Sequence, residues 1–199
     1  MFIRRFIQLQ IGLLLYGASL ALMVRADLGL NPWSVFHQGL SQETGLSLGT
    51  IVNLVGALVL LIWIPLRQKP GIGTICNVLV LGTAADATLA VLPPFSGLPL
   101  QIALLAGAIL LNGAATGAYI GAGLGPGPRD GLTTGGVRIT GWKVRWVRMT
   151  IEGLVLMLGW ALGSVVGVGT VAYALCNGPL LQIFLPMLEI KSHPITRPT

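Results

Sequence analysis

The chain contains six apolar segments that are each long enough to cross a lipid bilayer as a helix. A helix needs about 20 mostly apolar residues to span a hydrocarbon core that is roughly 30 Å thick. Hydrophobic residues make up 54% of the chain and charged residues only 9%, against about 25% charged in an average globular protein. The sequence therefore predicts an all-α integral membrane protein in contact with the lipid bilayer, with spans at about 6–25, 48–66, 72–92, 99–122, 147–166 and 168–188.

The basic residues predict how these spans are oriented. Lys and Arg gather on the cytoplasmic side of membrane proteins. With the N-terminus inside, only Arg25 falls outside and Arg129 is ambiguous. The inner side receives Arg4, Arg5, Arg67, Lys69, Arg138, Lys143, Arg145, Arg148, Lys191 and Arg197. We therefore expect a multi-pass protein of the bacterial inner membrane with both termini in the cytoplasm, a cytoplasmic tail at 189–199, and a retained first helix, since no signal-cleavage site follows it.

Several classes of protein are disfavoured by the same composition. The net charge of +6 comes from residues that flank apolar segments, without the aromatic interleaving of nucleic-acid binders. Cys76 and Cys176 have no metal or redox spacing, and we expect them to be small core residues. No metal-ligand cluster, phosphate loop, dinucleotide fingerprint or catalytic triad is present. We therefore expect no enzyme activity, metal or cofactor; an intramembrane enzyme is a distant possibility.

The chain also matches itself at a shift of 96 residues. "LGLNP" (28–32) falls on "LGPGP" (124–128), "GIGT" (71–74) falls on "GVGT" (167–170), and the Thr-Gly pair at 44–45 falls on the pair at 140–141. This pattern predicts two repeats, 1–92 and 99–188, each with three spans. Because three is odd, the second repeat is inverted in the membrane, an arrangement typical of transporters.

Each repeat carries a Pro-initiated half-helix after its first span, predicted at 32–43 and 128–138. Proline suits the first turn of a helix because its missing N–H is not needed there, Asn31 is a typical N-cap, and a glycine follows each segment. A 12-residue helix is about 18 Å long. It either re-enters the membrane, where irregular backbone must be buried in protein or line a cavity, or lies flat at the interface.

A re-entrant pair would bring two helix N-termini together near the midplane. Each N-terminus carries about half a positive charge and free N–H groups, which together favour an anion. The sequence therefore predicts a site for a small anionic or zwitterionic solute, built from Asn31, Pro32, Ser34, Gly127, Pro128, Arg129 and Asp130. Alternatively, the Arg-Asp pair lies in a cytoplasmic loop and helps to fix topology.

Other polar residues lie within the apolar segments, where ionisable groups are costly. Asp86 either couples a proton or cation or is a structural acid, and its repeat partner is Gln182. His37 either titrates near neutral pH or makes a satisfied polar contact. Asn53 is expected to join helices. Arg148 and Glu152, four residues apart on one helix, are expected to form a structural ion pair near the cytoplasmic end.

With "RADLGLNPWSVFHQGLSQETGLSLGT", "IPLRQKPGIGT" and "GAGLGPGPRDGLTTGGVRITGW" in view, the chain resembles the YczE/YyaS/YitT group of small bacterial membrane proteins, nearest the YczE-like branch. The resemblance covers the chain from its first helix to about Leu188. It implies a polytopic inner-membrane protein and no particular substrate. Where the family usually has an acidic residue after Pro-Trp, this chain has Ser34, whereas the Gly-Pro-Arg-Asp sequence at 127–130 is intact.

These observations predict a small secondary transporter or channel-like permease. In this hypothesis the half-helix N-termini and Arg129 hold the solute's anionic group, and Asp86 or Asp130 carries a coupling proton. The alternative is an accessory or regulatory membrane protein that does not transport and acts through helix–helix contacts. A homodimer is compatible with either.

Overall fold

The computed structural model describes residues 1–190, and within that range the protein is entirely helical. Its eight helices are α1 (Phe2–Ala26), α2 (Pro32–Thr44), α3 (Leu48–Trp63), α4 (Ile72–Val91), α5 (Leu98–Gly121), α6 (Pro128–Thr140), α7 (Val144–Ala161) and α8 (Val168–Leu188). The greater part of the expected tail, 191–199, lies outside the described residues. The predicted half-helices correspond to α2 and α6.

Four helices are long and apolar enough to cross a membrane: α1, α4, α5 and α8. A fifth crossing results if α2 and α3 are counted together, although they meet at an angle of 114°. On its own α3 has only 16 residues, and α7 carries three charged side chains. The protein is therefore a multi-pass helical membrane protein with four or five apolar crossings by this measure.

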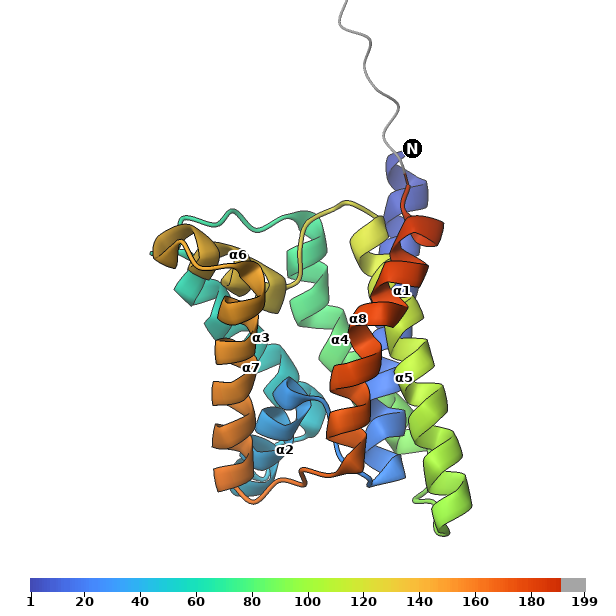
Figure 1. Cartoon of the computed structure of the whole chain (residues 1–199). Helices are drawn as coiled ribbons and strands as arrows, with labels where there is room; N and C mark the ends of the chain where they lie inside the picture. The colour runs from blue at the N-terminus through green and yellow to red at the C-terminus, as the bar shows by residue number, and fades with distance from the viewer. Residues whose placement is uncertain (191–199) are drawn as a thin grey trace, which may run out of the picture.

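The helices form two groups (Figure 1). In the first, α1 packs against α4 and α5, and α5 packs against α8; in the second, α2 packs against α7 and α3 against α6. Glycines permit the closest approaches, since a Cβ on Gly12 would collide with the α5 backbone and one on Gly17 with the α4 backbone. The two groups are joined along α3 and α4.

Glycines at every fourth position of α5 pack inside the first group. A Cβ on Gly113 would meet Leu180, and one on Gly117 would meet Phe184, both on α8. Small residues at every fourth position let two membrane helices approach closely. In α7, Gly159 lies against the backbone of Val35 and Phe36 in α2.

Contacts recur at positions 96 residues apart. The Gly169 N–H donates to the Leu28 carbonyl at 2.7 Å, and the Gly73 N–H donates to the Leu124 carbonyl at 2.8 Å. In both places the loop before a half-helix meets the first turn of a distant helix, α8 in one case and α4 in the other. These two backbone hydrogen bonds hold the first turns of α2 and α6 in position.

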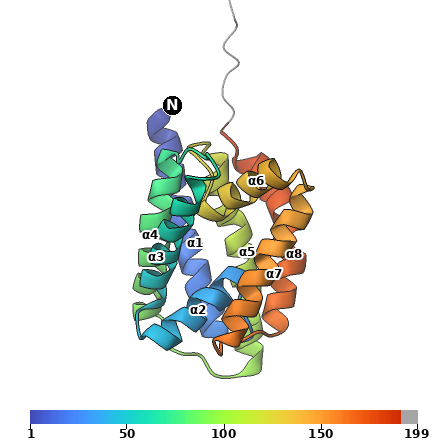
Figure 2. The same ribbon diagram turned by 90° about the vertical axis from the view of Figure 1, so that its left-hand side faces the viewer.

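The two ends of the described part of the chain, at Met1 and Ile190, lie at the same end of the molecule (Figure 2). The Arg5 guanidinium donates to the Ile190 carbonyl, and the Ile190 N–H donates to the Gly121 carbonyl. The half-helix α6 lies near this end, whereas α2 lies towards the other.

The link between α7 and α8 differs from the prediction. The sequence suggested a span at 147–166 and a tight hairpin at 167–169, but α7 ends at Ala161 and residues 162–167 form the connection. Gly163 has a φ of 83° and ends the helix. The Ser164 hydroxyl then donates to Gln38 Oε1 of α2 at 2.7 Å, which draws the connection towards α2. As a result α7 does not pack along α8.

Candidate functional site

The N-terminal turns of α2 and α6 line one cavity of about 90 Å³ between the two groups of helices. Asn31 caps α2, because its side-chain oxygen accepts the Ser34 N–H at 3.0 Å. Gly127 stands at the same place before α6 and has no side chain to act as a cap. A water needs about 10–15 Å³ of such volume, so the cavity has room for a small solute or several waters.

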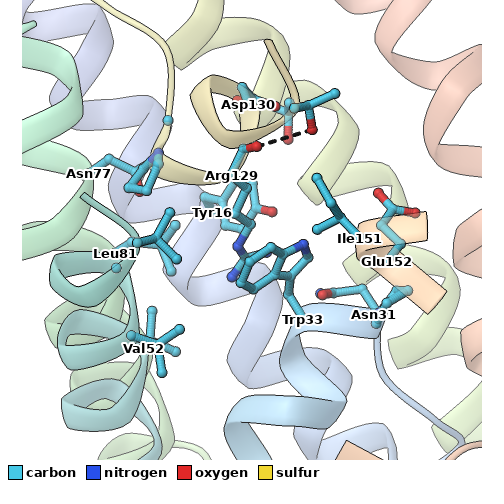
Figure 3. A pocket seen from close by; sticks show the side chains of 18 of the residues that line it. Tyr16, Asn31, Trp33, Val52, Asn77, Leu81, Arg129, Asp130, Ile151 and Glu152 are labelled. Carbon is cyan, nitrogen blue, oxygen red and sulfur yellow. Dashed lines mark hydrogen bonds between the residues drawn. The ribbon is translucent and has the colours of Figure 1, made fainter. Parts of the chain in front are cut away.

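The centre of the cavity holds an Arg–Trp contact between the two half-helices. The Arg129 guanidinium carbon lies 5.0 Å from the centroid of the Trp33 ring, within the range of a cation–π interaction. Figure 3 shows the Arg129 side chain next to the Trp33 ring. Positions 33 and 129 are themselves 96 residues apart, so equivalent positions of the two matching segments meet here.

Within the described residues, the Arg129 guanidinium makes no hydrogen bond and no ion pair, and only the backbone carbonyl of Arg129 accepts one, from the Thr133 hydroxyl. The neighbouring Asp130 instead accepts a hydrogen bond from the Tyr119 hydroxyl at 2.6 Å. Gly127 leaves room for this pair, because a Cβ there would lie 3.1 Å from the Tyr119 oxygen and 3.2 Å from Asp130 Oδ2. The guanidinium thus lines the cavity with its hydrogen-bond donors available to a ligand.

A second pair of charges lies in the wall formed by α7. Arg148 Nε donates to Glu152 Oε1 at 2.8 Å, which confirms the predicted contact between them. Both residues also line the cavity. The structural role near the cytoplasmic end that the sequence suggests for this pair stays a prediction. The pair faces the space between α7 and α8.

Several buried polar atoms of the cavity wall have no partner within the described protein. They are Asn31 Nδ2, His37 Nδ1, Thr116 Oγ1 and Asn177 Oδ1. Buried polar groups are normally hydrogen-bonded, and an unmatched one costs about 1–3 kcal/mol. Four such atoms around one cavity indicate that its natural contents are polar.

One wall of the cavity is apolar. Val52, Val55 and Leu81 line it on the side of α3 and α4, and Figure 3 shows Val52 and Leu81 across from Asn31 and Glu152. Trp33, Val55 and Val59 belong to one packed cluster that also includes Trp63, whose Nε1 donates to the Pro128 carbonyl at 3.0 Å. This cluster positions the start of α6.

Most of the solute-binding residues predicted from the sequence line this cavity: Asn31, Pro32, Gly127, Pro128, Arg129 and Asp130. Ser34 does not line it and is buried within α2, with its hydroxyl unpartnered. His37 lines the cavity and is 1% exposed. The fold therefore brings these residues together around one cavity.

Three residues predicted for the polar interior lie elsewhere. Asp86 Oδ1 accepts the Gly49 N–H at 2.7 Å and Asp86 Oδ2 accepts the Ser47 hydroxyl at 2.5 Å, at the start of α3. Asn53 Oδ1 accepts the Gly82 N–H at 3.0 Å and joins α3 to α4. Gln182 is exposed on α8, because its helix does not pack along α7, the neighbour that would have covered it.

The sequence did not predict the aromatic, hydroxyl and amide side chains that line the cavity from the long helices. Tyr16, Tyr119, Tyr173, Thr116 and Asn177 line it from α1, α5 and α8. The hydropathy patterns around these residues are those of ordinary packed helices. Only the packing of α1, α5 and α8 around the cavity brings them close to one another. Trp33 had a usable signal, since it occupies the repeat position of Arg129.

In the part of the chain that the structure describes, no three His, Cys, Asp or Glu side chains are grouped as a metal site would need. Cys76 is half-buried, whereas Cys176 is exposed on α8 rather than in the core as expected. The charged side chains at the cavity are Arg129, Asp130, Arg148 and Glu152. With two helix N-termini added to them, the arrangement favours binding of an anionic group.

The fold and this cavity define a multi-pass helical membrane protein with a polar internal site. Residues 3–186 match DUF6198, described as a family of unknown function, and the chain belongs to this family. It is 34% identical to the uncharacterised membrane protein YczE of Bacillus subtilis over 94% of this chain and 87% of the relative. This confirms the resemblance to the YczE-like proteins.

Two further relatives match a similar share of the chain. An uncharacterised protein of Haemophilus influenzae is 35% identical, over 92% of this chain and 86% of the relative. The uncharacterised protein YyaS of Bacillus subtilis is 25% identical, over 90% of this chain and 91% of the relative. No solved structure matches the chain.

Proposed function

We propose that the protein is a small secondary transporter or channel-like permease for a small anionic or zwitterionic solute. The observation that carries this proposal is Arg129, a cation that lines a buried cavity at two helix N-termini without an ion-pair partner in residues 1–190. A charge inside a membrane protein is costly and marks a functional site by default. The protein acts in this proposal by binding and release, without covalent chemistry.

The proposal includes six spans in two inverted repeats, 1–92 and 99–188. The backbone hydrogen bonds between Gly169 and Leu28 and between Gly73 and Leu124 support it, because they are equivalent contacts at a shift of 96 residues. Steric matches support it as well: Gly159 lies against Val35, and at the shifted positions Gly131 lies against Trp63. Transporters with inverted repeats bind their substrates near the midplane at broken helices.

We propose that the half-helices are re-entrant rather than interfacial, and the burial of α2 supports this. Residues 32–35 are all buried, and four consecutive buried residues cover every face of a helix that has 3.6 residues per turn. A helix lying at the membrane surface would leave one face exposed. The same orientation puts the basic residues of the loops beside the termini, in the cytoplasm by the positive-inside rule.

In this proposal Asp130, rather than Asp86, carries the coupling proton. Asp86 is occupied at the start of α3 and does not line the cavity. Asp130 is in the cavity and adjoins Arg129 in sequence, and Tyr119 donates a hydrogen bond to it. A carboxylate placed there can bind the cationic end of a zwitterion or exchange a proton as the solute moves.

Uptake by the purified protein in liposomes tests the proposal, with radiolabelled phosphate, acetate, glycine and glucose as probes. We expect entry of at least one charged probe and exclusion of glucose. Arg129→Gln should reduce uptake by about tenfold or more, because a charge-assisted hydrogen bond is worth about 1.5–3 kcal/mol. The matched control is Arg138→Gln on the same helix, since Arg138 donates to the Leu66 carbonyl outside the cavity.

Uptake that is equal in wild-type and Arg129→Gln liposomes would overturn the site. No uptake of any probe, together with recovery of one protein partner from the native membrane, would favour the accessory role instead.

A further inference from the structure

The two matching halves of the chain differ in the contact between their last two long helices. We call this contact the seam: it is the α3–α4 seam in the first half and the α7–α8 seam in the second. In the first half, α3 packs along α4, and two side chains close the seam. Asn53 accepts the Gly82 N–H, and Asp86 accepts the Gly49 N–H. In the second half the corresponding helices, α7 and α8, do not pack along one another. Figure 1 shows them apart, on either side of the centre of the molecule.

The second half lacks the groups that close this seam. At a shift of 96 residues, Asn53 corresponds to Met149, Gly82 to Gly178, and Asp86 to Gln182. Met149 and Gln182 are exposed, and a Cβ on Gly178 would meet nothing within 4 Å. The space between α7 and α8 is therefore bordered by Met149 on one helix and by Gly178 and Gln182 on the other, and no hydrogen bond closes it within the described residues.

The cavity reaches this space. Arg148 and Glu152 line it from α7, and Asn177 and Leu181 line it from α8. Gly178 and Ala174 follow Asn177 and Tyr173 by one residue each, about 100° further around α8, and both are exposed. The side chains of the ion pair are 47% and 33% exposed, so the cavity wall is open here.

The depth of the ion pair makes this opening chemically unusual. Glu152 is eight residues into α7, or about 12 Å along the helix. A charged side chain that faces hydrocarbon at this depth is costly, and a polar group or water must cover it. On the outer side of the opening, Met149 is exposed on α7 and the small residues Ala174 and Gly178 are exposed on α8, with Gln182 as a polar neighbour.

We propose that the cavity opens sideways to the bilayer between α7 and α8, and that its ligand is an amphiphile with an anionic phosphate head group. The head group binds at Arg129, beside the Arg148–Glu152 pair, and the apolar chain lies between α7 and α8. This inference rests on the proposed function for its anion site and adds the class of ligand and its route. A free phosphate would use the same head-group contacts, so the two sources must be separated by experiment.

Native mass spectrometry of the purified full-length protein, released from detergent micelles, separates these sources with three probes. Dioleoyl phosphatidate has both head and chains, dioleoylglycerol has the chains alone, and glycerol 3-phosphate has the head alone. We expect phosphatidate adducts to exceed the other two by about tenfold, the value of one charge-assisted hydrogen bond. Arg129→Gln should lower phosphatidate adducts to the dioleoylglycerol level.

A bulky residue in the opening tests the route. Gly178→Trp should lower phosphatidate binding by about tenfold and leave glycerol 3-phosphate binding unchanged. Gly107→Trp is the matched control, because a Cβ on Gly107 also meets nothing within 4 Å and this residue of α5 does not line the cavity. Equal thermal melting of both variants establishes that they fold, and Ala174→Leu provides a second, smaller block in the same opening.

Two results would overturn the inference in different ways. If glycerol 3-phosphate binds as well as phosphatidate, and Gly178→Trp has no effect on either, the ligand is a free anion and only the proposed anion site stands. If neither phosphate probe binds above dioleoylglycerol, and Arg129→Gln changes nothing, both the amphiphile and the anion site are wrong.

Discussion

At the scale of single residues, the glycine of each Leu-Gly-x-x-Pro stretch has a definite steric reason. Gly29 has a φ of 113° and Gly125 a φ of 126°, a region that side-chain-bearing residues rarely adopt. Gly29 also faces the start of α8, where an added Cβ would lie 2.8 Å from the Gly167 nitrogen. The motif therefore turns the chain and lets it touch another helix before each half-helix begins.

Gly29→Ala should destabilise the protein by about 2–4 kcal/mol, the sum of backbone strain and crowding against α8. Gly97→Ala is the matched control, because Gly97 has a φ of 105° and no atom within 4 Å of an added Cβ. It should show the backbone strain alone. Denaturant or thermal unfolding in detergent measures both, and equal losses for the two variants would contradict the role of the α8 contact.

Asn112 is the best-defined polar link in the first group of helices. It is fully buried, its Nδ2 donates to Ser19 at 2.8 Å, and its Oδ1 accepts from the Tyr173 hydroxyl at 2.9 Å. Asn112→Leu should cost about 0.5–2 kcal/mol, the range for hydrogen bonds between membrane helices. Tyr173→Phe removes one bond only and should cost less. A larger loss for Tyr173→Phe in the same unfolding measurement would place the link elsewhere.

At the scale of elements, the sequence predicted the helices well where the signal was local. Pro32 and Pro128 begin α2 and α6, and Gly45 and Gly141 follow their last residues with φ values of 72° and 69°. The end of α7 was predicted less well, because the apolar run continues past Ala161 while Ser164 bonds to α2. Local composition carries no information about that distant partner.

The start of α3 depends on a carboxylate from another helix. Asp86 of α4 accepts hydrogen bonds from Ser47 and Gly49 there, where a negative charge also complements the helix dipole. Asp86→Ala should therefore lower stability by about 1–2 kcal/mol and leave solute or lipid binding at the cavity unchanged. A variant that unfolds like wild type but loses pH-driven uptake would instead restore Asp86 as a coupling residue.

At the scale of the whole molecule, the two groups of helices combine both halves of the chain. The first half supplies α1 and α4 to one group and α2 and α3 to the other, and the second half supplies α5, α8, α6 and α7 in the same way. The cavity lies between the groups, so a small rotation of one group would change access to it from either side. In the proposed transport mechanism, the closed α3–α4 seam would serve as the hinge and the open α7–α8 seam as the side that moves.

The site was predictable from the sequence only as far as its charges and helix starts. Arg129 and Asp130 stood out because charges are rare in apolar segments, and the repeat identified their partner segment. The opening between α7 and α8, on which the proposed route rests, was not predictable, because it depends on two helices failing to pack. The sequence of neither helix alone indicates whether the two pack together.

Cysteine labelling from outside the cell tests the six-span arrangement as a whole. After Cys76 and Cys176 are replaced by serine, single cysteines are placed at exposed loop or helix-end positions: Glu43, Ser96 and Val165 at one end of the molecule, and Pro70 and Trp142 at the other. We expect a membrane-impermeant maleimide to label the first three in intact cells and the last two only after lysis, because basic loops stay inside. The decisive pair is Trp142 and Val165, at opposite ends of α7. If both label from the same side, α7 with its Arg148–Glu152 pair does not cross the membrane, and the inverted second repeat is excluded.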